Sequence, residues 1–287
     1  MTETFTLNDG NTIPGVGFGV FLIPADGSTY AAVKEAIAAG YRHIDTAQVY
    51  LNEKEVGQAI ADSGISREEI FVTTKLWLQD YAYDLAVKGL ETSLAKLGLD
   101  YIDLVLLHQP YGEVHDAWRA LEDFKAAGKI KSIGVSNMTP KLWQKFVPNF
   151  MTLPAVNQVE LHPYSQQKEL RQLLAKDNVL LEAWGPLGQG DAKLLSDPLI
   201  VSLAKKYGKD AGQIILRFEN QEGIIVLPKS TKPERIKSNL DIFDFTLTDE
   251  EMEVLQNLDK GQGKHDPDAP GVGEWLLSNY DIHAFDE

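Results

Sequence analysis

Eight short apolar segments, each followed by a segment of helical periodicity, constrain the fold of this chain more than any other sequence feature. Several helical segments are followed by glycine, a residue common just past a helix end. No linker or change of composition interrupts the alternation. We therefore predict a single α/β domain over residues 1–287, folded as a (β/α)8 TIM barrel of parallel strands. The predicted strands cover residues 15–21, a short segment ending at 45, 70–74, 101–107, 131–135, 155–160, 179–184 and 223–227. The predicted helices cover 28–39, 52–63, 83–97, 114–127, a short segment from 140, 167–176, 198–207, 210–219, 233–240 and 248–258.

The two ends of the chain lie outside this alternation. Residues 5–7 and 12–14 flank Asn8-Asp9-Gly10, a strong turn signal, and predict an N-terminal β-hairpin that plugs the barrel. The chain after Gly261 shows no comparable pattern, so we predict a C-terminal loop extension without regular structure.

A glycine-rich segment, Gly15-Val16-Gly17-Phe18-Gly19, resembles the phosphate loop of dinucleotide-binding folds. That loop belongs at a turn from strand to helix, whereas these glycines lie inside a strand-like segment. We favour the interpretation that they allow another backbone or a ligand to approach the first strand closely. A doubly wound open sheet is the rival fold, but it needs a switch in strand order that nothing in the sequence marks.

The amino-acid composition limits the classes of partner that we expect for this protein. The formal net charge is −15, from 27 basic and 42 acidic residues, and such a field repels the phosphates of nucleic acids. The chain has no cysteine, and its histidines lack metal-binding spacing, so we expect no metal site. No apolar run reaches the ~18 residues of a membrane span, and the N-terminus lacks the features of a signal peptide. We expect a monomeric, cytoplasmic protein with no membrane contact.

Titratable residues stand at the ends of three consecutive predicted strands. Asp45, Lys75 and His108 each follow such a strand, and Tyr50 comes five residues after Asp45. The carboxyl ends of parallel barrel strands meet on one face, so we expect these four side chains to lie together as catalytic residues. An ammonium group lowers the pKa of a neighbouring phenol, which suits Tyr50 as a proton donor tuned by Lys75 and Asp45. With His108 to orient a carbonyl oxygen, the set suits carbonyl reduction, and the hydride then requires a nicotinamide cofactor.

Several short motifs resemble the aldo-keto reductase family. The resemblance extends from about residue 5 to 258 and is carried by residues 40–47 (GYRHIDTA) with Tyr50, 74–77 (TKLW), 106–108 (LLH), 133–137 (IGVSN), 157–163 (NQVELHP) and 227–230 (LPKS). Residues 183–190 and 241–245 are most similar to the microbial branch that includes 2,5-diketo-gluconate reductases. The resemblance implies a (β/α)8 barrel that reduces aldehydes and ketones with NADPH.

The resemblance also implies a cofactor site. The residues that match family positions for the nicotinamide are Ser136, Asn137, Gln158 and Trp184, and those in the loop along the pyrophosphate are Leu187 and Gln189. Lys229, Ser230 and Arg235 match the clamp for the 2′-phosphate of NADPH, and Asn239 matches an adenine contact. A local basic cluster suits an anionic ligand in a protein this acidic, because guanidinium and ammonium groups bind phosphate directly.

The substrate pocket is less closely defined. Many relatives have tryptophan where this chain has Gln109, next to His108, so we expect a more polar pocket there. Phe21, Trp77 and Tyr111 are the expected apolar walls, with Trp275 of the tail as a further candidate. The substrates that fit are sugar ketoacids, methylglyoxal, aromatic aldehydes and α-keto esters. Two other functions stay open: a Schiff-base lyase with Lys75 as nucleophile, and a non-catalytic barrel that binds NADP and regulates a partner.

Overall fold

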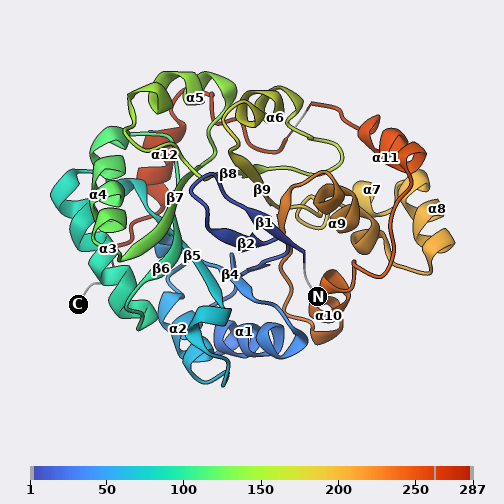
Figure 1. Ribbon diagram of the computed structural model, residues 1–287, viewed down its shortest axis with the longest axis horizontal. Helices are drawn as coiled ribbons and strands as arrows, with labels where there is room; N and C mark the ends of the chain where they lie inside the picture. The colour runs from blue at the N-terminus through green and yellow to red at the C-terminus, as the bar shows by residue number, and fades with distance from the viewer. Residues whose placement is uncertain (1–2, 262, 285–287) are drawn as a thin grey trace.

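A computed structural model of the chain describes residues 3–261 and 263–284. Figure 1 looks along a barrel of strands that is surrounded by helices. The described residues form an eight-stranded sheet in which neighbouring strands are parallel and follow the chain order, which confirms the predicted (β/α)8 barrel. Its strands are β3 (Phe18–Gly19), β4 (His43–Asp45), β5 (Phe71–Leu76), β6 (Ile102–Leu107), β7 (Ile130–Ser136), β8 (Val156–Glu160), β9 (Leu180–Trp184) and β10 (Ile225–Leu227).

The helices begin and end close to where the sequence predicts. The residue ranges 83–97, 198–207 and 233–240 are helical over the predicted bounds. The helices are α1 (Ser28–Ala39), α2 (Glu53–Ala61), α3 (Tyr83–Leu97), α4 (Val114–Ala126), α5 (Pro140–Phe146), α6 (Lys168–Ala175), α7 (Ala192–Leu195), α8 (Pro198–Tyr207), α9 (Ala211–Gln221), α10 (Pro233–Leu240), α11 (Asp249–Gln256) and α12 (Val272–Asn279). None of the described helices is long and apolar enough to cross a membrane.

Glycines close the barrel between its first and last strands. The backbone N–H of Gly17 donates to Val226 O at 2.9 Å, and Val226 N–H donates to Gly15 O at 3.0 Å. A Cβ atom on Gly17 would lie 2.6 Å from His43 Nδ1, so only glycine fits at this approach of two strands. The close-approach interpretation is confirmed, and the phosphate-loop alternative is wrong because the segment pairs with β10 rather than opening a helix.

The N-terminal hairpin covers one end of the barrel. Strands β1 (Thr4–Thr6) and β2 (Thr12–Pro14) pair antiparallel, as predicted, and lie over the barrel centre in Figure 1. Leu7 and Ile13 are buried in an apolar cluster with residues of β5, β6, β8 and β10. This cluster includes Phe71 and Ile225, the first residues of their strands, so the hairpin plugs the end opposite the strand carboxyl ends.

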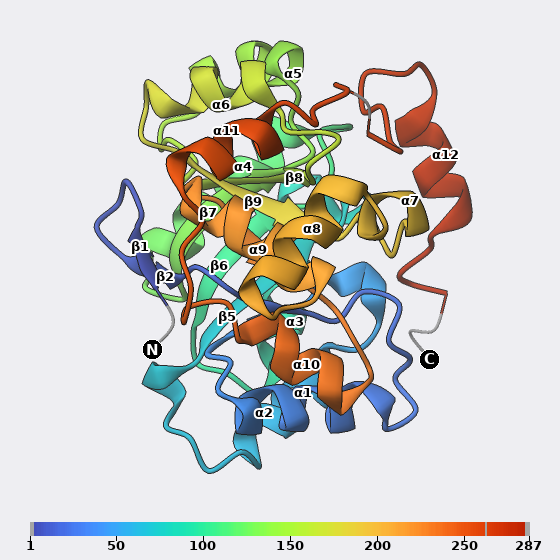
Figure 2. The same ribbon diagram turned by 90° about the vertical axis from the view of Figure 1, so that its right-hand side faces the viewer.

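The C-terminal tail is more ordered than predicted. Residues 272–279 form α12, on the side of the barrel away from the hairpin (Figure 2), so the prediction of a loop without regular structure is wrong. Gly273 is the one buried residue of this helix, and a Cβ atom there would lie 3.0 Å from the Tyr111 ring. The helix is therefore positioned by tertiary contacts, which hydrophobic periodicity does not reveal. The short helix α7 and the 3₁₀ helix η1 (Gln48–Tyr50) were likewise not predicted.

Glu219 of α9 is an unusual member of the core. Its side chain is fully buried, and neither carboxylate oxygen has a hydrogen-bond partner among the residues that the structure describes. Burial raises the pKa of this carboxyl well above its ordinary value.

We predict that Glu219→Gln stabilises the protein increasingly as the pH rises above about 4.5, the ordinary pKa of glutamate. A carboxyl whose pKa is raised by folding holds its proton longer in the folded state, so the wild type loses stability as the pH increases. An amide does not titrate and avoids this loss. Melting curves from pH 4.5 to 8 should show a growing difference, about 2–4 °C for each kcal/mol. The exposed control Glu253→Gln should show none, and a difference that does not depend on pH would contradict the prediction.

Candidate active site

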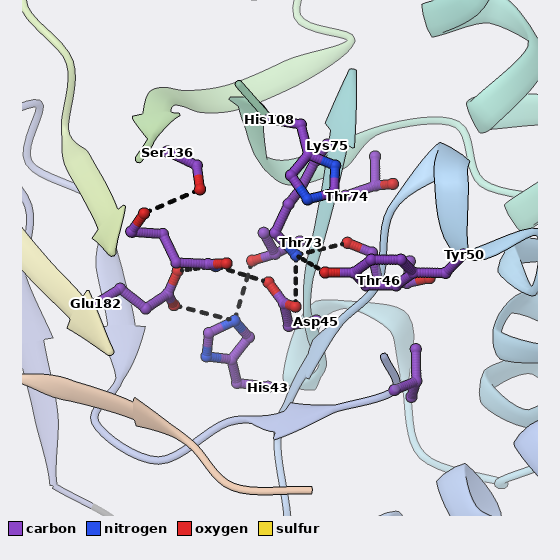
Figure 3. A network of polar contacts seen from close by, with 12 residues as sticks. His43, Asp45, Thr46, Tyr50, Thr73, Thr74, Lys75, His108, Ser136 and Glu182 are labelled. Atoms are coloured by element: carbon purple, nitrogen blue, oxygen red, sulfur yellow. Dashed lines mark hydrogen bonds and ion pairs between the residues drawn. The ribbon is translucent and has the colours of Figure 1, made fainter. Parts of the chain in front are cut away.

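Three of the four predicted catalytic side chains meet around one ammonium group. Lys75 Nζ donates hydrogen bonds to Asp45 Oδ1 at 2.6 Å and to Thr46 O at 2.9 Å, and it lies 3.4 Å from Tyr50 Oη (Figure 3). Asp45 ends β4, Lys75 lies near the end of β5, and Tyr50 ends η1, which follows β4. The parallel register therefore brings these residues together, as the sequence predicts.

The Lys75 ammonium is buried and the Tyr50 phenol is partly buried, and each shifts the pKa of the other. Burial alone would lower the pKa of Lys75, but the Asp45 carboxylate and the Tyr50 oxygen raise it above its ordinary value. Burial raises the pKa of Tyr50, and Lys75 opposes this by lowering it. The net direction for Tyr50 is upward, which differs from the sequence-based expectation because burial outweighs the neighbouring charge. Lys75 thus stays charged and Tyr50 keeps its proton.

His108 lies directly after β6, with its ring beside Tyr50. The ring centroids of the two residues are 5.6 Å apart, and the His108 ring is 5.2 Å from that of Trp77. Burial lowers the pKa of His108 well below its ordinary value, and the charge of Lys75 adds to this effect. The imidazole is therefore neutral, a form that can donate a hydrogen bond without carrying charge.

Two of the predicted pocket walls, Phe21 and Trp77, lie beside Tyr50 and His108. Phe21 lies 5.0 Å from the Tyr50 ring, and Trp77 donates a hydrogen bond from Nε1 to Tyr280 O of the tail. The backbone of Gln109 exchanges two hydrogen bonds with Tyr81 Oη, which holds its position after His108. Tyr111 donates to Pro267 O at 2.8 Å, so the tail reaches this side of the site as well. Trp275 is 56% exposed, and its ring lies 5.9 Å from the ring of Tyr280.

The residues expected to hold a nicotinamide form one hydrogen-bonded cluster. Asn137 has a left-handed backbone (φ 59°) and donates from Nδ2 to His108 O and to Ser136 Oγ. Trp184 donates from Nε1 to Asn137 Oδ1 at 2.9 Å. Gln158 donates from Nε2 to Asp45 Oδ2 at 2.9 Å. Left-handed backbone is uncommon outside glycine, and Asn137 thus stores strain next to the catalytic candidates.

The loop after β9 is tied to the C-terminal tail. Its residues Gly185, Gly188, Gln189 and Gly190 have positive φ, and Leu187 packs against the core. Lys264 donates from Nζ to Gly188 O at 2.6 Å, so the tail fastens the loop in which Leu187 and Gln189 lie.

Glu160 at the end of β8 anchors the same part of the tail. Its carboxylate accepts the backbone N–H groups of Lys264 and His265 at 2.9 and 3.0 Å. The His265 ring then lies 5.4 Å from the Trp184 ring. Contacts between β8 and residues a hundred positions later leave no local pattern in the sequence, so these roles of Glu160, Lys264 and His265 could not be predicted.

The predicted phosphate clamp lies after β10, at the start of α10. Lys229, Lys232 and Arg235 are exposed, and none has a carboxylate partner in the described part of the chain. Lys237, on the same helix, is instead paired with Glu35 at 3.1 Å. Ser230 is buried and accepts from Lys232 N–H at 3.0 Å, and Asn239 is buried one helical turn beyond Arg235. This leaves a local set of free cations in a protein of net charge −15.

Within residues 3–261 and 263–284, no group of three or more His, Asp or Glu side chains is arranged to hold a metal ion.

Comparison with known proteins identifies the family. The model of the aldo/keto reductase family matches residues 23–260. The chain belongs to the aldo/keto reductase family. It is 47% identical over 265 residues to an aldo-keto reductase of Mycolicibacterium smegmatis (91% of this chain, 95% of the relative), and 42% identical over 263 residues to the glyoxal reductase of Bacillus subtilis (91% and 95%). A solved structure of a variant of the protein Gox0644 in complex with NADPH is similar, with 38% identity, a TM-score of 0.88 and coverage of 94% of this chain and 98% of that one.

This aldo/keto reductase is therefore an oxidoreductase, and the recognition made from the sequence motifs is confirmed at the level of the family. The motif residues Asp45, Lys75 and Tyr50 are also the residues that the geometry brings together.

We predict that Lys75→Met destabilises the protein by about 3–5 kcal/mol at neutral pH, because it leaves the Asp45 carboxylate buried without its partner. Urea denaturation would measure the loss. The double variant Lys75→Met, Asp45→Asn removes both charges and should recover much of the stability. A single variant as stable as wild type would show that the ion pair does not stabilise the barrel interior.

Proposed function

We propose that this protein reduces aldehydes and ketones to alcohols with NADPH, with Tyr50 as the proton donor. The observation that carries the proposal is the position of Lys75 Nζ, 2.6 Å from Asp45 Oδ1 and 3.4 Å from Tyr50 Oη, at the carboxyl ends of the barrel strands. Active sites of (β/α)8 barrels lie on this face. Membership of the aldo/keto reductase family and the NADPH complex of a similar protein support it.

Each side chain has a distinct part in the proposed reaction. When bound, NADPH supplies the hydride to the carbonyl carbon. Tyr50 donates its hydroxyl proton to the carbonyl oxygen, and the charge of Lys75 stabilises the phenolate left behind. Asp45 keeps Lys75 protonated and in place. The neutral imidazole of His108 orients the carbonyl oxygen by donating a hydrogen bond, and Phe21, Trp77, Gln109 and Tyr111 enclose the substrate.

The residues available for the cofactor fit a dinucleotide phosphate. Lys229 and Arg235, which have no carboxylate partner among the described residues, suit the 2′-phosphate together with the hydroxyl of Ser230. Ser136, Asn137 and Gln158 offer amide and hydroxyl groups for the carboxamide, and the exposed part of Trp184 offers a stacking face. In the structure Asn137 already bonds His108, Ser136 and Trp184, so a bound carboxamide would exchange with one of these partners. We propose Leu187 and Gln189 for the pyrophosphate and Asn239 for the adenine.

The substrates we propose are small carbonyl compounds: sugar ketoacids, methylglyoxal, aromatic aldehydes and α-keto esters. The glyoxal reductase of Bacillus subtilis, similar over 91% of this chain, supports the small dicarbonyls among them. Kinetics over a panel of carbonyl compounds, with NADPH and NADH in parallel, would rank these classes.

The lyase alternative fits the geometry less well. A lysine must lose its proton to form a Schiff base, whereas Lys75 is buried against a carboxylate that, together with Tyr50, raises its pKa. The other alternative, a non-catalytic barrel that binds NADP and regulates a partner, does not explain the contact between Lys75 and Tyr50. Both alternatives predict no reduction of a simple aldehyde by NADPH.

We predict that Tyr50→Phe lowers kcat for carbonyl reduction by roughly 10²–10⁴, because it removes the proton donor and keeps the ring. NADPH binding, followed by quenching of tryptophan fluorescence, should be retained. Phe21→Leu, at the ring neighbouring Tyr50, is the matched control and should alter KM more than kcat. Reduction by Tyr50→Phe at the wild-type rate would remove Tyr50 from the role of acid.

We predict that Arg235→Ala weakens NADPH binding by roughly ten- to more than a hundredfold, since a charge-assisted hydrogen bond contributes about 1.5–3 kcal/mol. NADH lacks the 2′-phosphate and should bind almost as before. Lys237→Ala is the control, because Lys237 is a cation on the same helix that already has a carboxylate partner. Added salt should reduce the wild-type preference for NADPH. Equal losses for both cofactors would show that Arg235 does not bind the phosphate.

A further inference from the structure

Glu182 is a buried acid beside the candidate active site, and the proposed reaction gives it no role. It lies on β9 with a fully buried side chain, across the Asp45–Lys75 pair from Tyr50 in the view of Figure 3. Its Oε2 accepts from Gln158 Nε2 at 2.7 Å. Its Oε1 has no hydrogen-bond partner among the described residues and lies 3.8 Å from His43 Nε2.

Gln158 connects Glu182 to the ion pair. The same Nε2 atom donates to Glu182 and, at 2.9 Å, to Asp45 Oδ2, while the other oxygen of Asp45 accepts from Lys75. A continuous path of hydrogen bonds therefore leads from Glu182 through Gln158, Asp45 and Lys75 to Tyr50.

Charged and titratable groups that interact with Glu182 come from two strands and from η1. They are His43 and Asp45 of β4, Lys75 of β5 and Tyr50 of η1. The neutral Gln158 of β8 bonds Glu182, and the register partner of Glu182 on β10, Ile225, is apolar. Burial lowers the pKa of His43 to about 3, so it is neutral and does not offset a negative charge on Glu182. The negative charge of Asp45 and the positive charge of Lys75 cancel. These groups and Glu182 therefore carry no net charge only while Glu182 is neutral.

Burial raises the pKa of Glu182 to about 8, and the nearby Asp45 carboxylate adds to the effect. Glu182 thus changes from neutral to charged in mildly alkaline solution. Its negative charge, once present, favours the protonated forms of both Lys75 and Tyr50.

We propose that Glu182 is a positioning residue that acts through Gln158 and the Asp45–Lys75 pair to keep the Tyr50 proton in place as the solution becomes alkaline. The inference rests on the proposed role of Tyr50 as acid. Loss of a proton from Glu182 adds a negative charge to the barrel interior, which opposes the loss of a second proton from Tyr50. The range of pH over which the protein reduces carbonyls is thereby extended upward.

The test compares the pH dependence of kcat/KM for carbonyl reduction in wild type and Glu182→Gln. Glutamine keeps the shape and an acceptor oxygen but never gains charge. The alkaline limb of the profile should move down by roughly one pH unit, the order of shift that one unit charge exerts on a nearby group at the effective dielectric constant of a protein interior, ~20. Activity at the alkaline end should then fall about tenfold, well beyond any loss at neutral pH.

Glu219→Gln is the matched control, because Glu219 is also a fully buried glutamate, and its carboxylate has no hydrogen bond to another described residue. Its profile should match wild type. Infrared difference spectra between wild type and Glu182→Gln provide a second measurement, independent of turnover. They should show the carbonyl stretch of a protonated carboxyl group that disappears as the pH rises through about 8.

Two outcomes would overturn the inference. One is a Glu182→Gln profile that matches wild type or falls equally at every pH, since a purely structural role lowers activity without moving the limb. The other is the absence of a titrating protonated carboxyl group at position 182. If Tyr50→Phe retains reduction, the proposed function fails instead. If Tyr50→Phe loses reduction while Glu182→Gln behaves as wild type, only the role of Glu182 fails.

Discussion

The buried ion pair between Lys75 and Asp45 is the interaction on which the rest of the site depends. Moving two charges out of water is costly, and only close contact with further hydrogen bonds offsets the cost. Here the 2.6 Å contact is supplemented by Thr46 O and by the amide of Gln158. These partners come from β4, β5 and β8, so the pair also requires the barrel to be closed in the observed register. A fold that slipped by one residue would place the charges among the apolar side chains between barrel and helices.

The interior of the barrel is polar near the carboxyl ends of the strands and apolar near the hairpin. His43, Thr73, Gln158 and Glu182 surround the ion pair, whereas Leu7 and Ile13 seal the other end. Because the ion pair is buried, each charge interacts more strongly with its neighbours than it would in water. In such a setting the protonation of one group shifts that of its neighbours, and the acid proposed at Tyr50 is governed by the whole set rather than by Lys75 alone.

Much of this arrangement could be predicted from the sequence, because parallel strands bring their carboxyl ends together whatever the loops do. The positions of Asp45, Lys75 and His108 follow from that rule, and the helix bounds follow from apolar periodicity and from the glycines that end helices.

The position of Glu182 could not be predicted in this way. Its side chain faces the interior one strand away from Gln158, and a single acidic residue in an apolar strand gives no indication of its partners. The pKa of Tyr50 is raised by burial, and the spacing of residues in the sequence does not reveal this burial. Helix α12 was not predicted, because its position depends on contacts with Tyr111 and not on the hydrophobic periodicity of its own residues.

The tail crosses the carboxyl face of the barrel and joins parts of the site that are distant in sequence. It is fixed by Glu160 and by Lys264 beside the loop after β9, then by Tyr111 after β6, and finally by the bond from Trp77 to Tyr280 after β5. Some of its anchors are hydrogen bonds to backbone groups of the tail, as at Pro267 and Tyr280. Others use its side chains, as in the contacts of Asp281 with Gln79 and of His283 with Asp80. The residues around Lys75, in contrast, are held from within the barrel by the contacts among Asp45, Lys75, Tyr50 and Gln158. Substitutions in the tail are therefore expected to act first on Trp77 and Tyr111, the proposed walls of the substrate pocket, rather than on the ion pair beside Tyr50.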